Sequence, residues 1–355
     1  MKVLVIGGTS FIGRYLVEEL VKAGRDVTIL HRKAKHDLGR RVANIMADRN
    51  DAAALRAALA GYRFDLVYDN AYDWERGTTA AQVEATVQAC GSRVARYVFM
   101  SSVAAYGDGL NHYEGAPLAP DNHTDAYVRN KATAERMLFR LYQRTGFPVV
   151  TFRPPFVYGP GNPFYREAFF WDRLRLGRPI IIPGDGHRLM QFVYVHDLVR
   201  AIVQAGEEPS AAGEAFNIGN TRPVSQVELV GILAQVAGTE PTLVRVPRET
   251  IQQAGGDPMG NPAYFGVYYD VPPITENVTK FTRVLKVKPT PFEVGLKETY
   301  RVYLRTRRAQ PDFGFEDKLL AMARAGAKLG AGGPGTGAAG SAQGAGVRGP
   351  GAGIP

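Results

Sequence analysis

Short apolar runs alternate with amphipathic stretches through the first half of the chain. Residues 2–6 form an apolar, β-branched run typical of a buried strand, and apolar positions at helical spacing follow over residues 11–23. The alternation continues to about residue 175, with strand-like runs at 26–30, 43–46, 66–69 and 97–100. It predicts an α/β fold with a doubly wound parallel sheet, in which ligands meet the carboxyl ends of the strands.

A glycine-rich turn, Gly7-Gly8-Thr9-Ser10-Phe11-Ile12-Gly13, joins the first strand to the first helix. Free N–H groups and the helix dipole at such a turn face an anion, and glycine lets the backbone approach a pyrophosphate. Because the turn lies at the start of a strand–helix–strand unit, it predicts a dinucleotide site. The residues expected to contact the cofactor here are Gly7, Thr9, Ser10, Phe11, Ile12 and Gly13.

The residues that end the next strands indicate which dinucleotide binds. His31-Arg32-Lys33 stands where an acidic residue would bind the ribose of NAD, and a basic cluster suits the 2′-phosphate of NADP. The alternative is that this cluster is only a solvated loop. We therefore favour NADP, with NAD as the alternative. Further cofactor contacts are predicted at His31, Arg32, Asp48, Arg49, Asn70 and Ala71.

Tyr127 and Lys131, in a helix predicted over residues 127–141, are the main candidates for catalysis. Residues at this spacing lie on one face of a helix, where the lysine ammonium would lower the pKa of the tyrosine toward that of a useful base. Ser102 follows the strand-like run 97–100 and could hold the same substrate oxygen. The alternative is an ordinary exposed helix pair, but the glycine turn and Ser102 together favour hydride chemistry on a nicotinamide.

Several motifs, taken with those above, resemble the extended short-chain dehydrogenase/reductase superfamily, of the epimerase/dehydratase type. They include Ser101-Ser102-Val103-Ala104-Ala105-Tyr106-Gly107 and Arg153-Pro154-Pro155-Phe156-Val157-Tyr158-Gly159. The resemblance covers about residues 1–305. The matching runs are 7–13, 101–107, 153–162, 182–186, 192–198 and 216–220, together with Tyr127 and Lys131.

The resemblance implies a Rossmann-type domain over about residues 1–175 and a smaller α+β substrate domain over about 176–325, with some strands interleaved. It implies a site made of Ser102, Tyr127 and Lys131 that acts on a hydroxyl of a sugar nucleotide, and it suggests a homodimer. Tyr127 and Lys131 would also contact the cofactor. The remaining assignments are Pro154 to the cofactor, and Tyr106, Tyr158, Arg188 and Glu114 to the substrate.

Three departures from the family pattern weaken the sugar-nucleotide assignment. Met190-Gln191 stands where nucleotide-sugar enzymes often have Arg-Asp, Phe156 replaces a frequent asparagine, and Ser10 replaces the middle glycine of the turn. With these departures the sequence resembles atypical branches of the superfamily. One of these branches contains the chloroplast stem-loop RNA-binding proteins. The alternatives are therefore an NADPH-dependent reductase of a non-sugar carbonyl, or an RNA-binding protein. The net charge of +9 suits an anionic ligand of any of these kinds.

Three stretches could border this site. Residues 163–177 combine aromatic residues with arginines, so they could stack on a base or pack into the core. Residues 247–273 are rich in glycine and proline and indicate a long loop or lid, which contains Tyr268. Residues 107–124 form a polar loop that should overhang the site. Glu114 in this loop is either a second acid or base or a solvated carboxylate.

Composition limits the remaining possibilities. The chain has 355 residues and 45% hydrophobic content, enough for a sizeable core, and its one cysteine excludes an internal disulfide. The histidines show no metal-ligand spacing, so no metal is expected. No apolar run is long enough to cross a membrane, and a cytoplasmic location is expected. Residues 326–355, almost wholly small residues, are expected to form a disordered tail.

Overall fold

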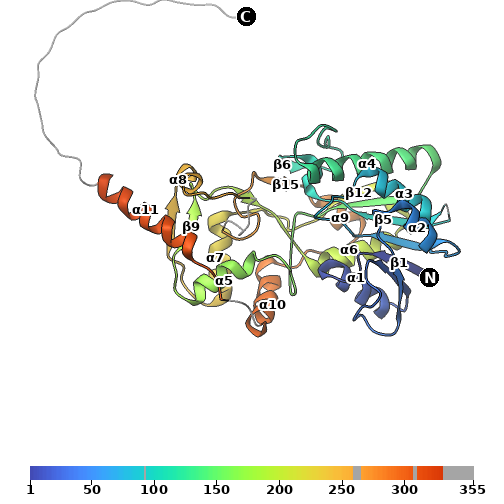
Figure 1. Ribbon diagram of the computed structural model, residues 1–355, viewed down its shortest axis with the longest axis horizontal. Coiled ribbons are helices and arrows are strands. Elements are labelled where there is room, and N and C mark those ends of the chain that lie inside the picture. The colour runs from blue at the N-terminus through green and yellow to red at the C-terminus, as the bar shows by residue number, and fades with distance from the viewer. Residues whose placement is uncertain (92, 259–264, 307–309, 331–355) are drawn as a thin grey trace, which may run out of the picture. The chain divides into compact units, whose positions relative to one another are not determined.

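Seven parallel strands form the central sheet, in the order β12-β7-β5-β4-β1-β2-β3 (Figure 1). The computed structural model describes residues 1–91, 93–258, 265–306 and 310–330. The chain first extends the sheet from β1 to β3 and then adds β4 on the other side of β1, and ligands of doubly wound sheets bind at such a reversal. The strands are β1 (Lys2–Ile6), β2 (Asp26–His31), β3 (Val42–Met46), β4 (Leu66–Asp69), β5 (Arg96–Met100), β7 (Val149–Arg153) and β12 (Glu214–Asn217).

Helices cover both faces of this sheet and bury a hydrophobic core against each face (Figure 1). Successive strand residues point to opposite faces, so Val5 of β1 belongs to one core and Leu4 to the other. The predicted doubly wound α/β fold is therefore confirmed. The helices on the Val5 side are α1 (Phe11–Lys22), α6 (Val195–Glu207) and α9 (Thr279–Val284), and those on the Leu4 side are α2 (Ala52–Leu59), α3 (Ala80–Cys90) and α4 (Ala126–Thr145).

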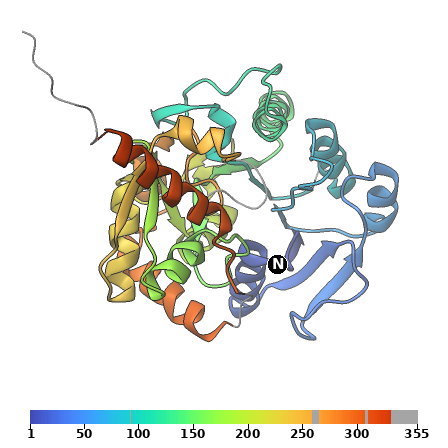
Figure 2. The same cartoon turned by 60° about the vertical axis from the view of Figure 1, so that its left-hand side comes forward.

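A smaller group of elements packs around helices α5 (Glu167–Arg175) and α7 (Gln226–Ala237) (Figure 2). Ser225 caps helix α7: its hydroxyl accepts from the amide of Glu228, while the Glu228 carboxylate accepts from the Ser225 amide. The other helices here are α8 (Arg248–Gln253) and α10 (Phe292–Arg305), and the short strand pairs are β8 (Phe156–Tyr158) with β11 (Phe192–Tyr194), β9 (Ile180–Pro183) with β14 (Leu243–Val246), and β10 (Leu189–Met190) with β13 (Val224–Ser225).

The chain passes between these two groups more than once. Helix α6 and strand β12 return to the central sheet after β9 to β11 have formed, so the boundary expected near residue 175 is crossed repeatedly. The division into a Rossmann-type domain and a substrate domain stays a prediction. The loop expected at 107–124 also contains a strand, β6 (Gly109–His112), because it pairs with the distant β15 (Ile274–Glu276). Short 3₁₀ helices lie at Val103–Tyr106 and Pro209–Ala211.

The chain divides into two compact units, Met1–Pro311 and Asp312–Pro355. The second unit contains helix α11 (Gly314–Gly330). Residues 326–330 of the expected tail are thus helical. They complete a helix whose residues 318–325 are all leucine, alanine, methionine, lysine or arginine, which favour a helix. Residues 331–355 lie outside the described part of the chain. No helix in the described part is long and apolar enough to cross a membrane. The cytoplasmic location stays a prediction.

Candidate active site

A cavity of about 1400 Å³ opens at the carboxyl ends of the central strands. Pockets for one drug-sized ligand are about 300–1,000 Å³, so this cavity has room for two molecules. Loops that follow β1, β2, β3, β4, β5 and β7 line one side of it, and residues from β8, β10 and the segment 268–274 line the other. The cavity lies where the strand order predicts a ligand.

The turn after β1 forms a cradle for phosphate groups. Gly7 has a φ of +83°, and a Cβ on Gly13 would stand 2.0 Å from the carbonyl oxygen of Gly7, so both positions require glycine. Ser10 is the N-cap of helix α1, but its side chain forms no hydrogen bond with the helix, so the first N–H groups are available to an anion. These features fit the pyrophosphate of a dinucleotide. The predicted residues of this turn that line the cavity are Gly7, Thr9, Ser10, Phe11 and Ile12. Gly13 does not line it but packs against the backbone of Gly7.

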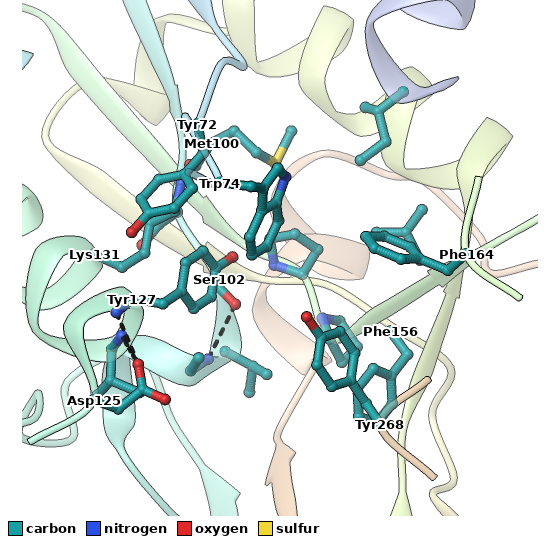
Figure 3. A pocket seen from close by; sticks show the side chains of 18 of the residues that line it. Tyr72, Trp74, Met100, Ser102, Asp125, Tyr127, Lys131, Phe156, Phe164 and Tyr268 are labelled. Carbon is teal, nitrogen blue, oxygen red and sulfur yellow. Dashed lines mark hydrogen bonds between the residues drawn. The ribbon is translucent and has the colours of Figure 1, made fainter. Parts of the chain in front are cut away.

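Helix α4 presents Tyr127 and Lys131 to the cavity (Figure 3). The Asp125 carboxylate caps this helix by accepting from the amides of Tyr127, at 2.8 Å, and Val128, at 3.1 Å. Ser102 lies two residues after β5, where its Oγ accepts from the amide of Ala104 at 3.2 Å and lies next to the Tyr127 side chain (Figure 3). Lys131 donates from Nζ to the carbonyl oxygen of Met100 at 2.6 Å. The three predicted catalytic side chains therefore meet in one place.

The protonation state of Tyr127 differs from the sequence-based expectation. Burial raises its pKa to about 12, although the neighbouring Ser102 hydroxyl acts in the opposite direction. The Lys131 ammonium lies 5.7 Å from the centre of the Tyr127 ring, and it is held by the backbone at Met100. The expectation that Lys131 lowers the pKa of Tyr127 is thus wrong, because desolvation of the buried phenol is the largest effect and raises that pKa. Tyr127 is a neutral phenol here.

Burial of Lys131 predicts a dependence of stability on pH. Its pKa is lowered from 10.5 to about 8, so the folded state binds fewer protons than the unfolded state between these values. The ammonium therefore costs stability below pH 8, and this cost disappears as the pH rises toward 10.5. We expect Lys131→Met to be about 2 kcal/mol more stable than the wild type at pH 7 and to lose this advantage by pH 10. Urea denaturation at both pH values measures the difference; an unchanged difference would contradict it.

The expected adenosine end of the cofactor site contains a network of ion pairs. Arg32 lines the cavity with its side chain 64% exposed, and its guanidinium stands 3.6 Å from the carboxylate of Asp73. Asp48 also lines the cavity and pairs with Arg76 at 2.6 Å. Arg49 is buried, and its Nη2 donates to Asp69 at 2.6 Å. Arg49 therefore has a structural partner in addition to its place in the cavity wall.

The predicted substrate residues divide into two groups. Tyr106 and Arg188 line the cavity, but Glu114 and Tyr158 are not among the described residues that do. The Glu114 carboxylate instead accepts from the amide of Asn217, at 3.2 Å, and the buried Tyr158 hydroxyl donates to a backbone carbonyl at 3.4 Å. The structure thus places both away from the proposed chemistry. The other predicted residues in the cavity wall are His31, Asn70, Ala71 and Pro154.

Among the cavity residues that were not predicted from the sequence, three lie close to the predicted site residues. Tyr72 and Trp74 follow β4 and pack against Tyr127, with ring centroids 4.9 and 5.0 Å from its ring. Arg248 begins α8 and reaches the cavity wall from a segment expected to be a loop. Their positions depend on the packing of distant segments. The sequence offered one indication for Tyr72 and Trp74: they follow Asn70, a predicted cofactor contact, by only two and four residues. No cluster of three metal-ligating side chains occurs among the described residues.

The chain is similar to known proteins over most of its length. Residues 3–219 match the model of the NAD dependent epimerase/dehydratase family. The chloroplast stem-loop binding protein of 41 kDa b from Arabidopsis thaliana is 29% identical over 343 residues, which are 90% of this chain and 84% of that protein. A UDP-glucose 4-epimerase from Vibrio cholerae is 30% identical over 258 residues, 68% of this chain and 76% of that protein.

A solved structure shows the same architecture. MoeE5 in complex with UDP-glucuronic acid and NAD superimposes with a TM-score of 0.68 at 26% sequence identity. The match covers 86% of this chain and 99% of that chain.

Proposed function

Because this chain belongs to the NAD dependent epimerase/dehydratase family, we propose that it is an NAD(P)-dependent epimerase or dehydratase acting on a hydroxyl of a sugar nucleotide. The observation that carries this proposal is the meeting of Ser102, Tyr127 and Lys131 beside the glycine cradle in one cavity. A cavity of about 1400 Å³ has room for both a dinucleotide and a sugar nucleotide.

The three side chains divide the chemistry between them. The nicotinamide of the cofactor, when bound, takes up and returns the hydride. The Tyr127 hydroxyl exchanges a proton with the substrate hydroxyl, and Ser102 holds that oxygen in place. Lys131 supplies a positive charge beside Tyr127, which favours the phenolate once the proton must leave. Because Tyr127 starts as a neutral phenol, it is ready to donate a proton to a ketone and needs the Lys131 charge for the reverse step.

Two arginines on the far wall suit the phosphates of such a substrate. Arg188 and Arg248 both line the cavity, and both reach the buried carboxylate of Asp270, at 3.3 and 2.9 Å. A shared carboxylate holds the two guanidiniums together, and guanidinium groups bind phosphate oxygens through paired hydrogen bonds. Arg188 lies close in sequence to Met190, so it offers a charge that the expected Arg-Asp pair would have supplied.

The test of this function has two parts. Denaturing the purified protein and identifying the released dinucleotide by mass spectrometry establishes the cofactor. Incubating the protein with UDP-glucose and that cofactor, and following the sugar by NMR, establishes the reaction. We expect an isomerised or dehydrated sugar. A protein that neither retains a dinucleotide nor binds one on titration would contradict the proposal.

For the cofactor we propose NADP, from the basic loop that ends β2, although MoeE5 is described with NAD. Arg32→Ala is expected to weaken NADP binding by at least about tenfold and to leave NAD binding unchanged, because charge-assisted hydrogen bonds to a phosphate contribute about 1.5–3 kcal/mol. Lys35→Ala, an exposed change in the same loop, is the matched control. If titration shows that Arg32→Ala binds NADP as tightly as the wild type does, or that the wild type binds NAD more tightly than NADP, the result would favour NAD.

We also propose a homodimer formed through α4 and its neighbour α3, on the basis of the family resemblance. Sedimentation of the purified full chain tests it. A species of twice the chain mass is expected, and a monomer at micromolar concentration would contradict it.

A second candidate function is binding of a nucleic-acid stem-loop. It is favoured by the match to a stem-loop binding protein over 90% of this chain. The loop after β2 also presents exposed cations, namely Arg32, Lys33, Lys35, Arg40 and Arg41. A mobility-shift titration with an RNA hairpin should show binding that weakens steeply between about 50 and 200 mM salt. Absence of a shift at low salt would dismiss this function.

A further inference from the structure

Four aromatic side chains, Tyr127, Trp74, Phe164 and Tyr268, surround the catalytic hydroxyls, and we call them the aromatic frame (Figure 3). The indole of Trp74 lies 5.0 Å from the Tyr127 ring at an interplanar angle of 20°, and Phe164 meets the indole edge-on at 6.4 Å. Tyr268 lies 6.1 Å from Phe164 and is close enough to Tyr127 to raise the pKa of its phenol. The frame thus borders the space beside Ser102.

Two observations indicate that the frame meets a ligand. Trp74 is 60% exposed although it lines the cavity, so much of its indole has no protein contact. Tyr268 has a φ of +63°, a conformation that bulky residues rarely adopt and that tends to occur at functional sites. The backbone next to Trp74 is held, because the Asp73 carboxylate accepts from the amides of Glu75, at 3.0 Å, and Arg76, at 2.9 Å. Adjustment to a ligand is therefore left to the indole.

The charges around the frame do not suit an anionic ring substituent. Among the described residues beside the frame, Arg166 is buried in an ion pair with Glu167 at 2.8 Å, so its charge is compensated. The Lys131 ammonium donates to the carbonyl oxygen of Met100 and lies beside the Tyr127 ring, so in our assignment its charge serves the phenol rather than a ring substituent. Asp125 adds a negative charge that acts on the phenols of both Tyr127 and Tyr268.

Building on the proposed function, we infer that the aromatic frame selects a neutral sugar ring and disfavours a uronic acid at the reacting position. The C–H face of a neutral ring packs on the exposed indole, and removing this apolar area from water favours binding. The faces of aromatic rings are electrically negative, so they repel a carboxylate, as does Asp125. A buried carboxylate without a partner is also costly. Trp74 is therefore a specificity-determining residue of the site.

The test compares UDP-glucose with UDP-glucuronic acid as substrates. We expect the wild type to favour UDP-glucose by at least about tenfold in kcat/KM. Trp74→Ala should lower kcat/KM for UDP-glucose about tenfold, mainly through a higher KM, and should reduce the preference between the two sugars. Trp74→Phe keeps an aromatic face and should retain most of the wild-type preference.

Tryptophan emission provides a readout that does not depend on turnover. The other tryptophan, Trp171, is buried, with its indole N–H donating to the carbonyl of Leu233 at 3.2 Å, so it serves as an internal reference. UDP-glucose added to the cofactor-loaded protein should change the emission of Trp74, and Trp74→Phe should abolish this change.

The outcomes separate this inference from the proposed function. If the wild type uses both sugars equally well, or if Trp74→Ala leaves KM and the preference unchanged, the inference is overturned while the proposed function stands. If neither sugar nucleotide binds to or reacts with the cofactor-loaded wild type, the proposed substrate class fails, and the inference fails with it.

Discussion

Replacing Tyr127 with phenylalanine is expected to lower turnover by about 10²–10⁴-fold, which is the usual contribution of a positioned acid–base group. The substitution removes one hydroxyl and keeps the ring that packs against Tyr72 and Trp74. The fold and the phosphate cradle should therefore be unaffected. Steady-state turnover of UDP-glucose and cofactor affinity, measured on the same preparation, test both halves of this expectation.

Tyr72→Phe is the matched control for this experiment. Its ring lies 4.9 Å from that of Tyr127, and its hydroxyl accepts a hydrogen bond from the Asn130 side chain at 3.2 Å. It should lose less than about tenfold in turnover, because its hydroxyl does not meet the substrate oxygen in our assignment. A Tyr127→Phe enzyme as active as Tyr72→Phe would remove Tyr127 from its proposed role.

Local patterns in the sequence are sufficient to predict the elements that position this site. Strand β1 occupies the predicted residues, and α4 contains the helix predicted over 127–141 and is somewhat longer. The capping residue Asp125 immediately precedes the first residue of this helix. Periodicity and capping depend on residues within one turn or strand, so they can be recognised in the chain alone.

The meeting of Ser102 with Tyr127 and Lys131 could also be predicted, because the ends of parallel strands converge at one edge of a sheet. Contacts between distant segments follow no such rule. Tyr158 belongs to a matching motif, yet its hydroxyl bonds to the backbone at Phe292. Trp74 belongs to no motif whose spacing could be recognised in the sequence. It reaches Tyr127 only because α4 and the loop after β4 pack together.

Protonation was the property least accessible from the sequence. The spacing of Tyr127 and Lys131 suggests a depressed tyrosine pKa, but burial of both groups raises that pKa to about 12 and lowers that of Lys131 to about 8. Desolvation depends on every element around the pair, so spacing within one helix cannot give its size.

The ion pair of Glu135 and Arg153 lies directly behind the cavity and is almost completely buried. Nη2 of Arg153 donates to Oε2 of Glu135 at 2.7 Å, and Nη1 donates to the Tyr106 hydroxyl at 2.6 Å. Glu135 also accepts a hydrogen bond from Ser101, the residue before Ser102. The pair thus connects α4 and β7 to two segments of the cavity wall.

Arg153→Met is expected to lower the free energy of unfolding by about 3–5 kcal/mol, because it leaves the Glu135 charge buried without its partner. The double variant Glu135→Met/Arg153→Met removes both charges and should stay within about 2 kcal/mol of the wild type. Urea denaturation of the three proteins measures these differences. A double variant at least as unstable as Arg153→Met would show that the hydrogen bonds to Ser101 and Tyr106, rather than the unpaired charge, determine the stability of this region.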